Sequence, residues 1–439
     1  VWLRTQVGAT TRVWRGGDHS TDAEHPALSR PGARVTMINV LSQCGAHFPN
    51  SVAARPYDGG MPRTAAHILE TPASGVRQIL ELALAQEGAI ILAVGEPGQD
   101  VAEPIRQAGA DAWMAGHTRY TANGGIAPLR RAIVDKLARI NDMQVDIEQV
   151  WVTIGATQGL HQAMAITLGV GDEVLLPDPG YTTFTMNAHM LHATPVPYTL
   201  SPARGFQPDI AQLETLVTDR TRLLIINSPS NPLGSTFERE TIQELLDFAR
   251  RHDLWVLSDE CYEAFTYGVA HVSPAALDTD DRVFTVFSTS KTYAMTGIRV
   301  GYLVTPRGFR DTMVRVQEAA ISCVNTPAQF AALEAITGSQ APVRDAAAHY
   351  RANFDAATAL LDTRGFTYLT PTGAFYLWID MSHVADGDVA AWCERFLRED
   401  GVAVAPGSAF GRTGEGWIRV CCASTRDDLL EGLRRLPAP

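Results

Sequence analysis

Short apolar runs alternate with amphipathic helical stretches through the middle of the chain. Each run is rich in Val, Ile and Leu and ends in a polar or glycine-containing turn. The alternation is typical of parallel strands covered by helices, because such strands are buried on both faces. We therefore predict an α/β fold with a mostly parallel central sheet. The expected strands are residues 150–154, 173–176, 222–226, 254–257, 283–287 and 300–304.

The region before these strands has a different texture. Residues 1–70 are rich in Gly, Pro, Ser, Thr and Arg without sustained periodicity, so we expect a loose or partly disordered N-terminal extension. The alternative is that translation begins at Met37 or Met61. Residues 71–102 carry a helical pattern and then a short strand-like run. We expect this segment to contribute to a smaller domain.

The sequence pattern changes a second time near residue 330, where the alternation of strand-like and helical stretches ends. Residues 103–330 contain the expected strands and are predicted to form the large domain. Residues 331–439 follow, with an Ala-rich helical region at 329–361 and strand-like pieces at 375–378 and 417–420. We therefore expect a smaller α+β domain at the C-terminal end.

Composition and charge exclude several classes of protein. The 439 residues are 46% hydrophobic and 19% charged, which is ordinary globular usage. The formal net charge of −12 leaves no basic excess to hold a polyanion, so we expect no nucleic-acid partner. No run approaches the roughly 18 apolar residues of a membrane-spanning helix, so we expect no membrane association.

The cysteines indicate neither disulfides nor zinc. They are scattered, with no Cys-x-x-Cys pair and no Cys/His spacing typical of a metal site. We expect reduced thiols, no metal and a cytoplasmic location; no secretory signal is predicted, and a transit peptide is the alternative. The cysteines are Cys44, Cys261, Cys323, Cys393, Cys421 and Cys422.

Candidate chemistry follows two of the expected strands. Ligands of open parallel sheets bind beyond the carboxyl ends of the strands. The run 254–257 leads into Asp259 and Tyr262, and the run 283–287 leads into Lys291. A lysine there is costly to bury as a cation unless its pKa is lowered, and Arg299 could be the neighbouring cation that lowers it. A neutral amine is a nucleophile toward aldehydes, so Lys291 is a candidate for Schiff-base chemistry, with a surface lysine as the alternative.

A glycine-rich turn supplies a candidate anion site. Residues 155–159 follow one expected strand and precede a helical stretch, which places free backbone N–H groups at a helix N-terminus. The alternative is an ordinary tight connection between strand and helix.

Three motifs occur in order along the chain: the segment 227–234 around Asn231, Asp259 with Tyr262, and Ser288-Thr289-Ser290-Lys291 with Arg299. Together they resemble the class I/II aminotransferases, which are fold type I enzymes that use pyridoxal 5′-phosphate (PLP). The resemblance covers about residues 71–436. It implies a large PLP-binding domain with a mostly parallel sheet and a smaller α+β domain. One departure is Leu233, where the family usually has Thr.

The resemblance implies roles around the cofactor ring. Lys291 matches the lysine that holds PLP as an internal aldimine and then moves the proton between Cα and C4′. Asp259 matches the carboxylate that keeps the pyridine nitrogen protonated. Tyr262 and Asn231 match the residues that hydrogen-bond the ring oxygen O3′. Tyr181 matches the aromatic residue that stacks on the ring, with simple packing as the alternative.

The remaining implied contacts concern the phosphate and the substrate. Tyr120 matches a tyrosine that reaches the phosphate in the neighbouring subunit, which implies a homodimer. Arg419 matches the arginine that binds the substrate α-carboxylate, and Gly95 matches the glycine whose backbone approaches it. A surface salt bridge and a plain turn are the alternatives. The implied phosphate cradle consists of Ala156, Thr157, Ser288, Ser290 and Arg299.

The family match implies a PLP-dependent aminotransferase that moves the α-amino group of an amino acid to a 2-oxo acid. The first alternative is another PLP reaction, such as cyclisation, elimination or replacement, C–C bond formation or oxidation in specialised biosynthesis. The second is a non-catalytic effector-binding module. The amino acid itself is not predicted; Trp113, Phe375 and Tyr376 are candidate walls of its pocket, with ordinary core packing as the alternative.

Overall fold

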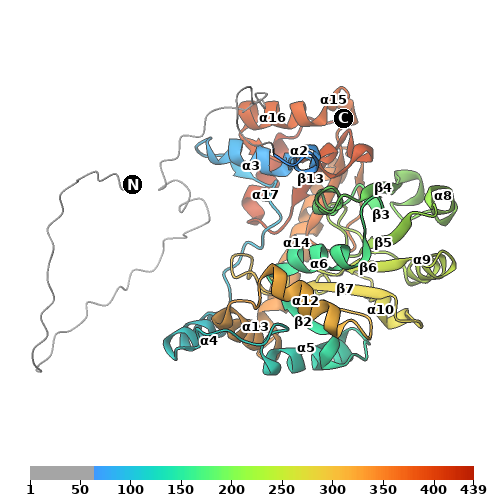
Figure 1. Ribbon diagram of the computed structural model, residues 1–439. Helices are drawn as coiled ribbons and strands as arrows, with labels where there is room; N and C mark the ends of the chain where they lie inside the picture. Colours follow the sequence, from blue (N-terminus) through green and yellow to red (C-terminus); the bar gives the residue numbers. More distant parts are fainter. Residues whose placement is uncertain (1–63) are drawn as a thin grey trace, which may run out of the picture. The chain divides into compact units, whose positions relative to one another are not determined.

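The computed structural model describes residues 64–439, and the expectations for residues 1–63, including the alternative starts at Met37 and Met61, lie outside the described residues. Its centre is a seven-stranded sheet in the order β2-β8-β7-β6-β5-β3-β4 (Figure 1). The strands are β2 (Val150–Thr153), β3 (Glu173–Asp178), β4 (Thr194–Thr199), β5 (Thr221–Asn227), β6 (Trp255–Asp259), β7 (Val283–Ser288) and β8 (Gly301–Val304).

The central sheet is mostly parallel, as the sequence predicts. β8 alone among its strands runs antiparallel to both neighbours. The six expected strands are all present, with bounds that differ by one or two residues. β4 was not predicted, because Pro195 and Pro197 interrupt its strand pattern. β4 is an edge strand paired only with β3 among the described strands, and an edge tolerates residues that cannot donate a backbone hydrogen bond.

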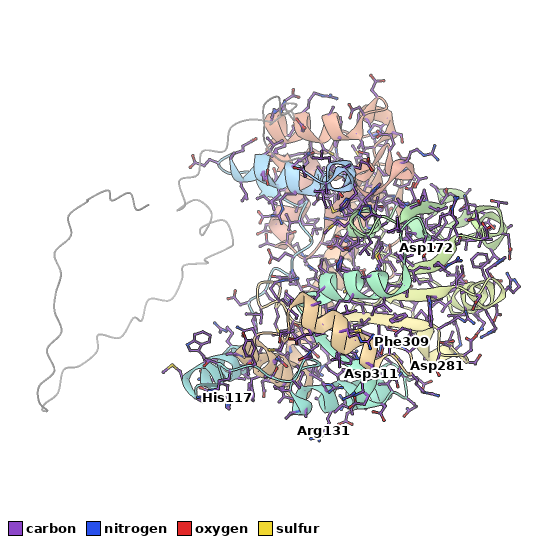
Figure 2. All side chains as sticks on the ribbon, in the orientation of Figure 1. His117, Arg131, Asp172, Asp281, Phe309 and Asp311 are labelled. Atoms are coloured by element: carbon purple, nitrogen blue, oxygen red, sulfur yellow. The ribbon has the colours of Figure 1, made fainter. Side chains whose placement is uncertain are left out.

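Alternate residues of the strands enter different hydrophobic clusters. In β5, Leu224 and Ile226 belong to one cluster, while Leu223 and Ile225 belong to another. Phe309, labelled in Figure 2, packs edge-on against Trp255 and Phe284, with ring centroids 5.4 and 5.0 Å apart. The sheet is therefore buried on both faces, which explains the nearly continuous apolar runs in the sequence.

Helices cover these faces and extend to the ends of the sheet. Figure 1 shows α4, α5 and α13 grouped beside β2. The helices up to residue 337 are α2 (Ala66–Glu70), α3 (Gly75–Leu84), α4 (Glu103–Met114), α5 (Ala127–Ile140), α6 (Gly155–Thr167), α7 (Thr183–Met190), α8 (Ile210–Leu216), α9 (Arg239–Arg251), α10 (Pro274–Leu277), α11 (Thr289–Thr292), α12 (Arg310–Ala320) and α13 (Thr326–Thr337), with 3₁₀ turns at Ile147–Gln149 and Pro202–Arg204.

A second sheet of four antiparallel strands has the order β12-β13-β10-β9. Its strands are β9 (Tyr368–Leu369), β10 (Tyr376–Asp380), β12 (Ala405–Pro406) and β13 (Trp417–Cys421). The helices beside it are α14 (Ala341–Thr363), α15 (Ser382–Ala385), α16 (Val389–Asp400) and α17 (Arg426–Arg435), with 3₁₀ turns η3 (Gly407–Phe410) and η4 (Arg412–Gly414). The expected long helical region is thus two helices, α13 and α14.

The segment before the large sheet joins this second region. β1 (Ile90–Ile91) pairs in parallel with β11 (Val402–Ala403), and α3 packs against β11, β12 and α16. Earlier in the chain, α2 packs against α7. The domain boundaries at residues 70, 102 and 330 stay predictions. Among the described helices, none combines the length and the apolar character needed to cross a bilayer.

Candidate active site

A cavity of about 520 Å³ lies beyond the carboxyl ends of β6 and β7. Strand ends of a parallel sheet and the turns after them supply part of its lining, and the segment after β1 and the strands β10 and β13 supply another part. Residues far apart in the sequence therefore meet there. The expected site residues that line it are Gly95, Ala156, Thr157, Tyr181, Asn231, Asp259, Tyr262, Ser288, Ser290, Lys291, Arg299 and Arg419.

Lys291 lies in the short helix α11, directly after β7. Its Nζ donates a hydrogen bond to the carbonyl oxygen of Gly95 at 2.7 Å. Burial lowers the pKa of Lys291, although Cys261 and Glu96 act to raise it. Among the main contributors the neighbouring cation is Arg419, and not Arg299 as the sequence suggested. The uncharged form of the amine is thus favoured relative to an exposed lysine.

Asp259 ends β6 as a buried carboxylate. Its Oδ1 accepts a hydrogen bond from the backbone N–H of Cys261 at 3.1 Å. Burial raises the pKa of Asp259, against the lowering effect of the hydrogen bonds from Cys261. Asp259 forms no ion pair with any residue that the structure describes. A buried acid at a cavity wall without a cationic partner suits a positively charged ligand group.

The first turn of α6 and the side chain of Arg299 form a cradle. Gly155 has φ +63°, and a Cβ atom there would lie 2.3 Å from a terminal guanidinium nitrogen of Arg299. Glycine is therefore required for this close approach. Because the backbone N–H groups of a helix N-terminus and a guanidinium both attract anions, the cradle suits a phosphate group.

Arg419 projects from β13 into the cavity and is only 3% exposed. Its guanidinium donates to Oδ1 of Asn231 at 2.7 Å and to the carbonyl oxygen of Ala93. It lies 4.4 Å from the ring centroid of Tyr376 and 4.6 Å from that of Phe410. No carboxylate of the described residues pairs with it, so the surface-salt-bridge alternative is wrong, and the buried cation suits a carboxylate ligand.

The aromatic residues divide between cavity and core. Tyr181 and Tyr262 line the cavity, and the hydroxyl of Tyr262 lies 2.7 Å from that of Tyr376. Of the three candidate pocket walls, only Tyr376 lines the cavity. Phe375 is fully buried in the core, and Trp113 is 58% exposed on a separate groove. The pocket role is therefore wrong for these two residues within this chain: Phe375 packs into the aromatic core beside Tyr350, and Trp113 lies on the neighbouring groove that α4 lines.

Two other expectations concern residues outside the cavity. Tyr120 is 89% exposed and does not line the cavity of its own chain. Its contact with a neighbouring subunit stays a prediction. Leu233, the departure from the family pattern, is fully buried in the core and does not line the cavity either.

Sequence reasoning missed several cavity residues. Arg77, in the first turn of α3, and Phe410, in η3, gave no local signal because their motifs are ordinary amphipathic or turn sequences. Thr296 lies between Lys291 and Arg299, and its hydroxyl donates to Glu96. The other lining residues that were not predicted are Ser74, Val76, Val94, Leu160, Thr182, Thr183, Met186 and Cys261.

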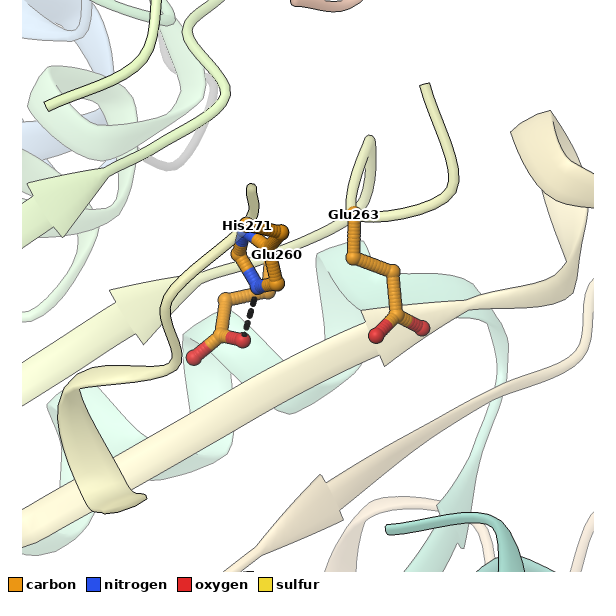
Figure 3. A group of neighbouring side chains, drawn as sticks. All are labelled: Glu260, Glu263 and His271. Atoms are coloured by element: carbon orange, nitrogen blue, oxygen red, sulfur yellow. Dashed lines mark hydrogen bonds and ion pairs between the residues drawn. The ribbon is translucent and has the colours of Figure 1, made fainter. Parts of the chain in front are cut away.

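A cluster of ionisable side chains lies on the other side of the Asp259 segment. Glu260, Glu263 and His271 bring potential ligand atoms within 4.8 Å of one another (Figure 3). Glu260 is fully buried and accepts hydrogen bonds from Nε2 of His271 at 2.7 Å and from the hydroxyls of Ser258 and Ser273.

The acidic groups of this cluster already have partners. Glu263 pairs with Lys136 and accepts from Nδ2 of Asn141 at 2.6 Å. Burial is the largest single influence and acts to lower the pKa of His271, but the hydrogen bond that His271 donates to Glu260 and the negative charges of Glu260 and Glu263 together raise it. The cluster therefore forms two buried ion pairs when His271 is protonated. Because protein cations satisfy both carboxylates, the donor set does not favour a metal ion.

We expect His271→Gln to destabilise the fold most at acid pH. Because the folded-state pKa of His271 is raised, its charged form stabilises the protein fully below the unfolded value, about 6.5, and this contribution is lost as pH rises through the folded value. Chemical unfolding at pH 6 should show a loss of about 3 kcal/mol. That loss should shrink by pH 9. A matched change at exposed His383 should show no such trend, and a pH-independent loss for His271→Gln would contradict the ion pair.

Comparison with known proteins agrees with this geometry. The sequence model of the family described as aminotransferase class I and II matches residues 87–436. The putative aminotransferase YugH of Bacillus subtilis is 34% identical over 84% of this chain and 96% of its own length. The aromatic-amino-acid aminotransferase 2 of Thermococcus litoralis is 34% identical over 83% of this chain and 94% of its own length.

A solved structure extends the similarity to the fold. The aspartate aminotransferase of Thermus thermophilus with maleate superposes with a TM-score of 0.81 at 32% identity, over 85% of this chain and 99% of that chain. The family match and the relatives together cover both sheets described above. The chain therefore belongs to the class I and II aminotransferases and is an aminotransferase with the fold of the aspartate aminotransferases.

Proposed function

We propose that this aminotransferase uses PLP, held at Lys291, to move the α-amino group of an amino acid to a 2-oxo acid. One observation carries the proposal: two buried groups line the same cavity. They are the amine of Lys291, whose pKa is lowered, and the carboxyl of Asp259, which has no ion-pair partner among the described residues. The names of the relatives favour transfer over cyclisation, elimination or oxidation. Nothing in the cavity favours a purely non-catalytic binding role.

The residues present fit PLP part by part. The cradle at Gly155 and Arg299 suits the phosphate, together with Ser288, Ser290, Ala156 and Thr157. The unpaired carboxyl of Asp259 suits a protonated pyridine nitrogen. Tyr181 offers a ring for stacking, and Tyr262 and Asn231 offer polar atoms for the ring oxygen. The cavity volume of about 520 Å³ lies within the usual range for cofactor sites.

Each residue then has a defined task. When bound, PLP supplies an electron sink for the electrons of the substrate Cα–H bond. Arg419 binds the α-carboxylate through its guanidinium, which orients Cα. Nζ of Lys291 takes the proton from Cα, since its lowered pKa keeps the amine free to accept it. Asp259 holds the proton at the ring nitrogen by its negative charge.

The central test uses Lys291→Ala and Asp259→Asn. The first variant should lose all transfer and all borohydride-dependent mass gain at position 291, because the amine is gone. The second should keep the cofactor through its phosphate cradle, while kcat falls on the order of 100-fold or more. Asp311→Asn, an exposed carboxylate labelled in Figure 2, is the matched control. Full turnover by Asp259→Asn would contradict the role of Asp259.

The proposed assembly is a homodimer in the cytoplasm. A groove of about 550 Å³ is lined by residues of α4 and α13 and of the segment 295–299, including Trp113 and Ile298. Both side chains are large and exposed, which is typical of a protein interface. Arg299 lines this groove and the cavity, so a partner seated there would lie beside the phosphate cradle. Exposed Tyr120 would then reach the phosphate in the neighbouring subunit.

The described cysteines are free thiols, which supports a reducing compartment.

We expect Trp113→Glu to convert the dimer into monomers, because it places a charge in the apolar groove. Sedimentation measures this change. Tyr120→Phe should leave the dimer intact and raise the dissociation constant of PLP about tenfold, as expected for one lost hydrogen bond to a charged group. A parent protein that sediments as a monomer would contradict the proposed assembly.

For the substrate side chain, we propose recognition of a second carboxylate by Arg77. The cavity is lined by the cations Arg77, Lys291, Arg299 and Arg419 and by one carboxylate, Asp259. PLP and the α-carboxylate engage every one of these groups except Arg77. Its side chain makes no hydrogen bond or ion pair with the described residues. The maleate named with the Thermus relative is likewise a dicarboxylate.

We expect Arg77→Gln to raise KM for 2-oxoglutarate 10- to 100-fold, because a charge-assisted hydrogen bond is lost. KM for pyruvate, which has a single carboxylate, should change less than about twofold. Steady-state kinetics with both acceptors measures the difference. Arg131→Gln, on the exposed face of α5 and labelled in Figure 2, is the control. Equal effects on both acceptors would contradict side-chain recognition by Arg77.

A further inference from the structure

Tyr376, at the start of β10, contacts several of the site residues at once. Its hydroxyl lies 2.7 Å from the hydroxyl of Tyr262, and the guanidinium of Arg419 lies 4.4 Å from its ring centroid. Its hydroxyl also lies against Gly95, whose carbonyl oxygen accepts the hydrogen bond from Lys291. Tyr376 is almost fully buried, so these contacts are protected from water.

The register of the small sheet explains the contact with Arg419. β10 and β13 are antiparallel, with Tyr376 opposite Cys421 and Trp378 opposite Arg419. Tyr376 and Arg419 therefore lie diagonally on the same face of the sheet, at a distance that long and aromatic side chains span. A buried guanidinium over a tyrosine ring is held in place by cation–π attraction.

The contact with Gly95 holds the hydroxyl of Tyr376 in place. A Cβ atom on residue 95 would lie 1.9 Å from that hydroxyl oxygen and 2.8 Å from the adjacent ring carbon. Only glycine leaves room for the ring to extend this far. The hydroxyl of Tyr376 is thus confined between the backbone of Gly95 and the hydroxyl of Tyr262.

The two hydroxyls share a single hydrogen bond, so one of the two protons is left for another acceptor. Either hydroxyl can be the donor, and neither has another hydrogen-bond partner among the described residues. Arg419 lies over the ring of Tyr376, and its positive charge makes this hydroxyl a better donor. Donation from Tyr376 to Tyr262 leaves the proton of Tyr262 directed to a ligand in the cavity.

We propose that Tyr376 is a positioning residue of the transfer reaction: it donates to Tyr262, so that Tyr262 donates to the cofactor ring, and it holds Arg419 for the substrate carboxylate. Hydrogen bonds in such a chain strengthen one another. The proposal rests on the role of Tyr262 in the proposed function. It adds a cavity residue that acts through Tyr262 and Arg419 and not directly on the reacting atoms.

The test compares Tyr376→Phe with Tyr262→Phe and with the double variant. Tyr376→Phe keeps the ring under Arg419 and removes only the donor. We expect kcat to fall about fivefold with KM for the amino acid nearly unchanged. The pH at which the absorbance of the bound cofactor changes should rise by about half a unit, because weaker donation leaves more negative charge on the ring oxygen.

The double variant decides whether Tyr376 acts through Tyr262. We expect the double variant to match Tyr262→Phe alone in kcat and in the absorbance transition, since the second deletion removes a donor that has lost its acceptor. Effects that multiply would overturn the proposal. So would a Tyr376→Phe variant with the parent's absorbance transition. If Tyr262→Phe itself behaves as the parent, the role of Tyr262 in the proposed function is wrong, which is a separate failure.

Two further variants separate positioning from packing. Tyr350→Phe removes another buried hydroxyl from the same core cluster, one that donates to Gln99 at 2.9 Å and does not line the cavity. We expect it to leave the absorbance transition where it is. Tyr376→Leu also removes the ring beneath Arg419, and we expect KM for the amino acid to rise severalfold in addition to the lower kcat. A Tyr376→Leu variant with unchanged KM would overturn the coupling to Arg419, and thermal melts report whether each variant is folded.

Discussion

The site depends on burying charged groups without giving them ion-pair partners inside the described chain. Asp259 and Arg419 lie almost fully buried on one cavity, and neither forms a salt bridge with a described residue. Unpaired buried charge is destabilising, so the surrounding sheets must supply the stability that keeps these groups in place. The same cost becomes binding free energy when a ligand of complementary charge enters.

The rest of the fold limits this cost in two ways. Backbone groups partly solvate the charges: Cys261 donates to Asp259, and Ala93 accepts from Arg419. Glycine at two positions lets side chains approach the backbone closely: Arg299 lies against Gly155, and the hydroxyl of Tyr376 lies against Gly95. These contacts involve backbone groups and closely packed side chains, which hold the cavity residues in position before a ligand binds.

The cluster behind the cavity follows the opposite rule. Glu260 is as buried as its neighbour Asp259, yet it is paired with His271 and hydrogen-bonded by two serine hydroxyls. Two adjacent buried carboxylates thus differ in their partners: Glu260 has a cationic partner within the chain, and Asp259 has none among the described residues. Glu260 with its partners anchors the segment after β6, whereas Asp259 is the acid that we propose for the ligand. A buried carboxyl without a protein cation is a candidate for binding a ligand, whereas a paired carboxylate stabilises the fold.

The sequence by itself determined the central sheet and the residues that follow its strands. Apolar periodicity is a local property, so β2, β3, β5, β6, β7 and β8 could be predicted. The same runs placed Asp259 and Lys291 after two of these strands, and the resemblance implied their roles. The sequence pattern did not predict β4, because its prolines are compatible with a strand only at the edge of a sheet, and the tertiary structure places β4 at the edge. Only the tertiary structure brought Arg77 into the cavity and decided that, of the candidate walls, Tyr376 lines it and Trp113 does not. These placements depend on contacts between segments hundreds of residues apart, and such contacts leave no periodic signal in the local sequence.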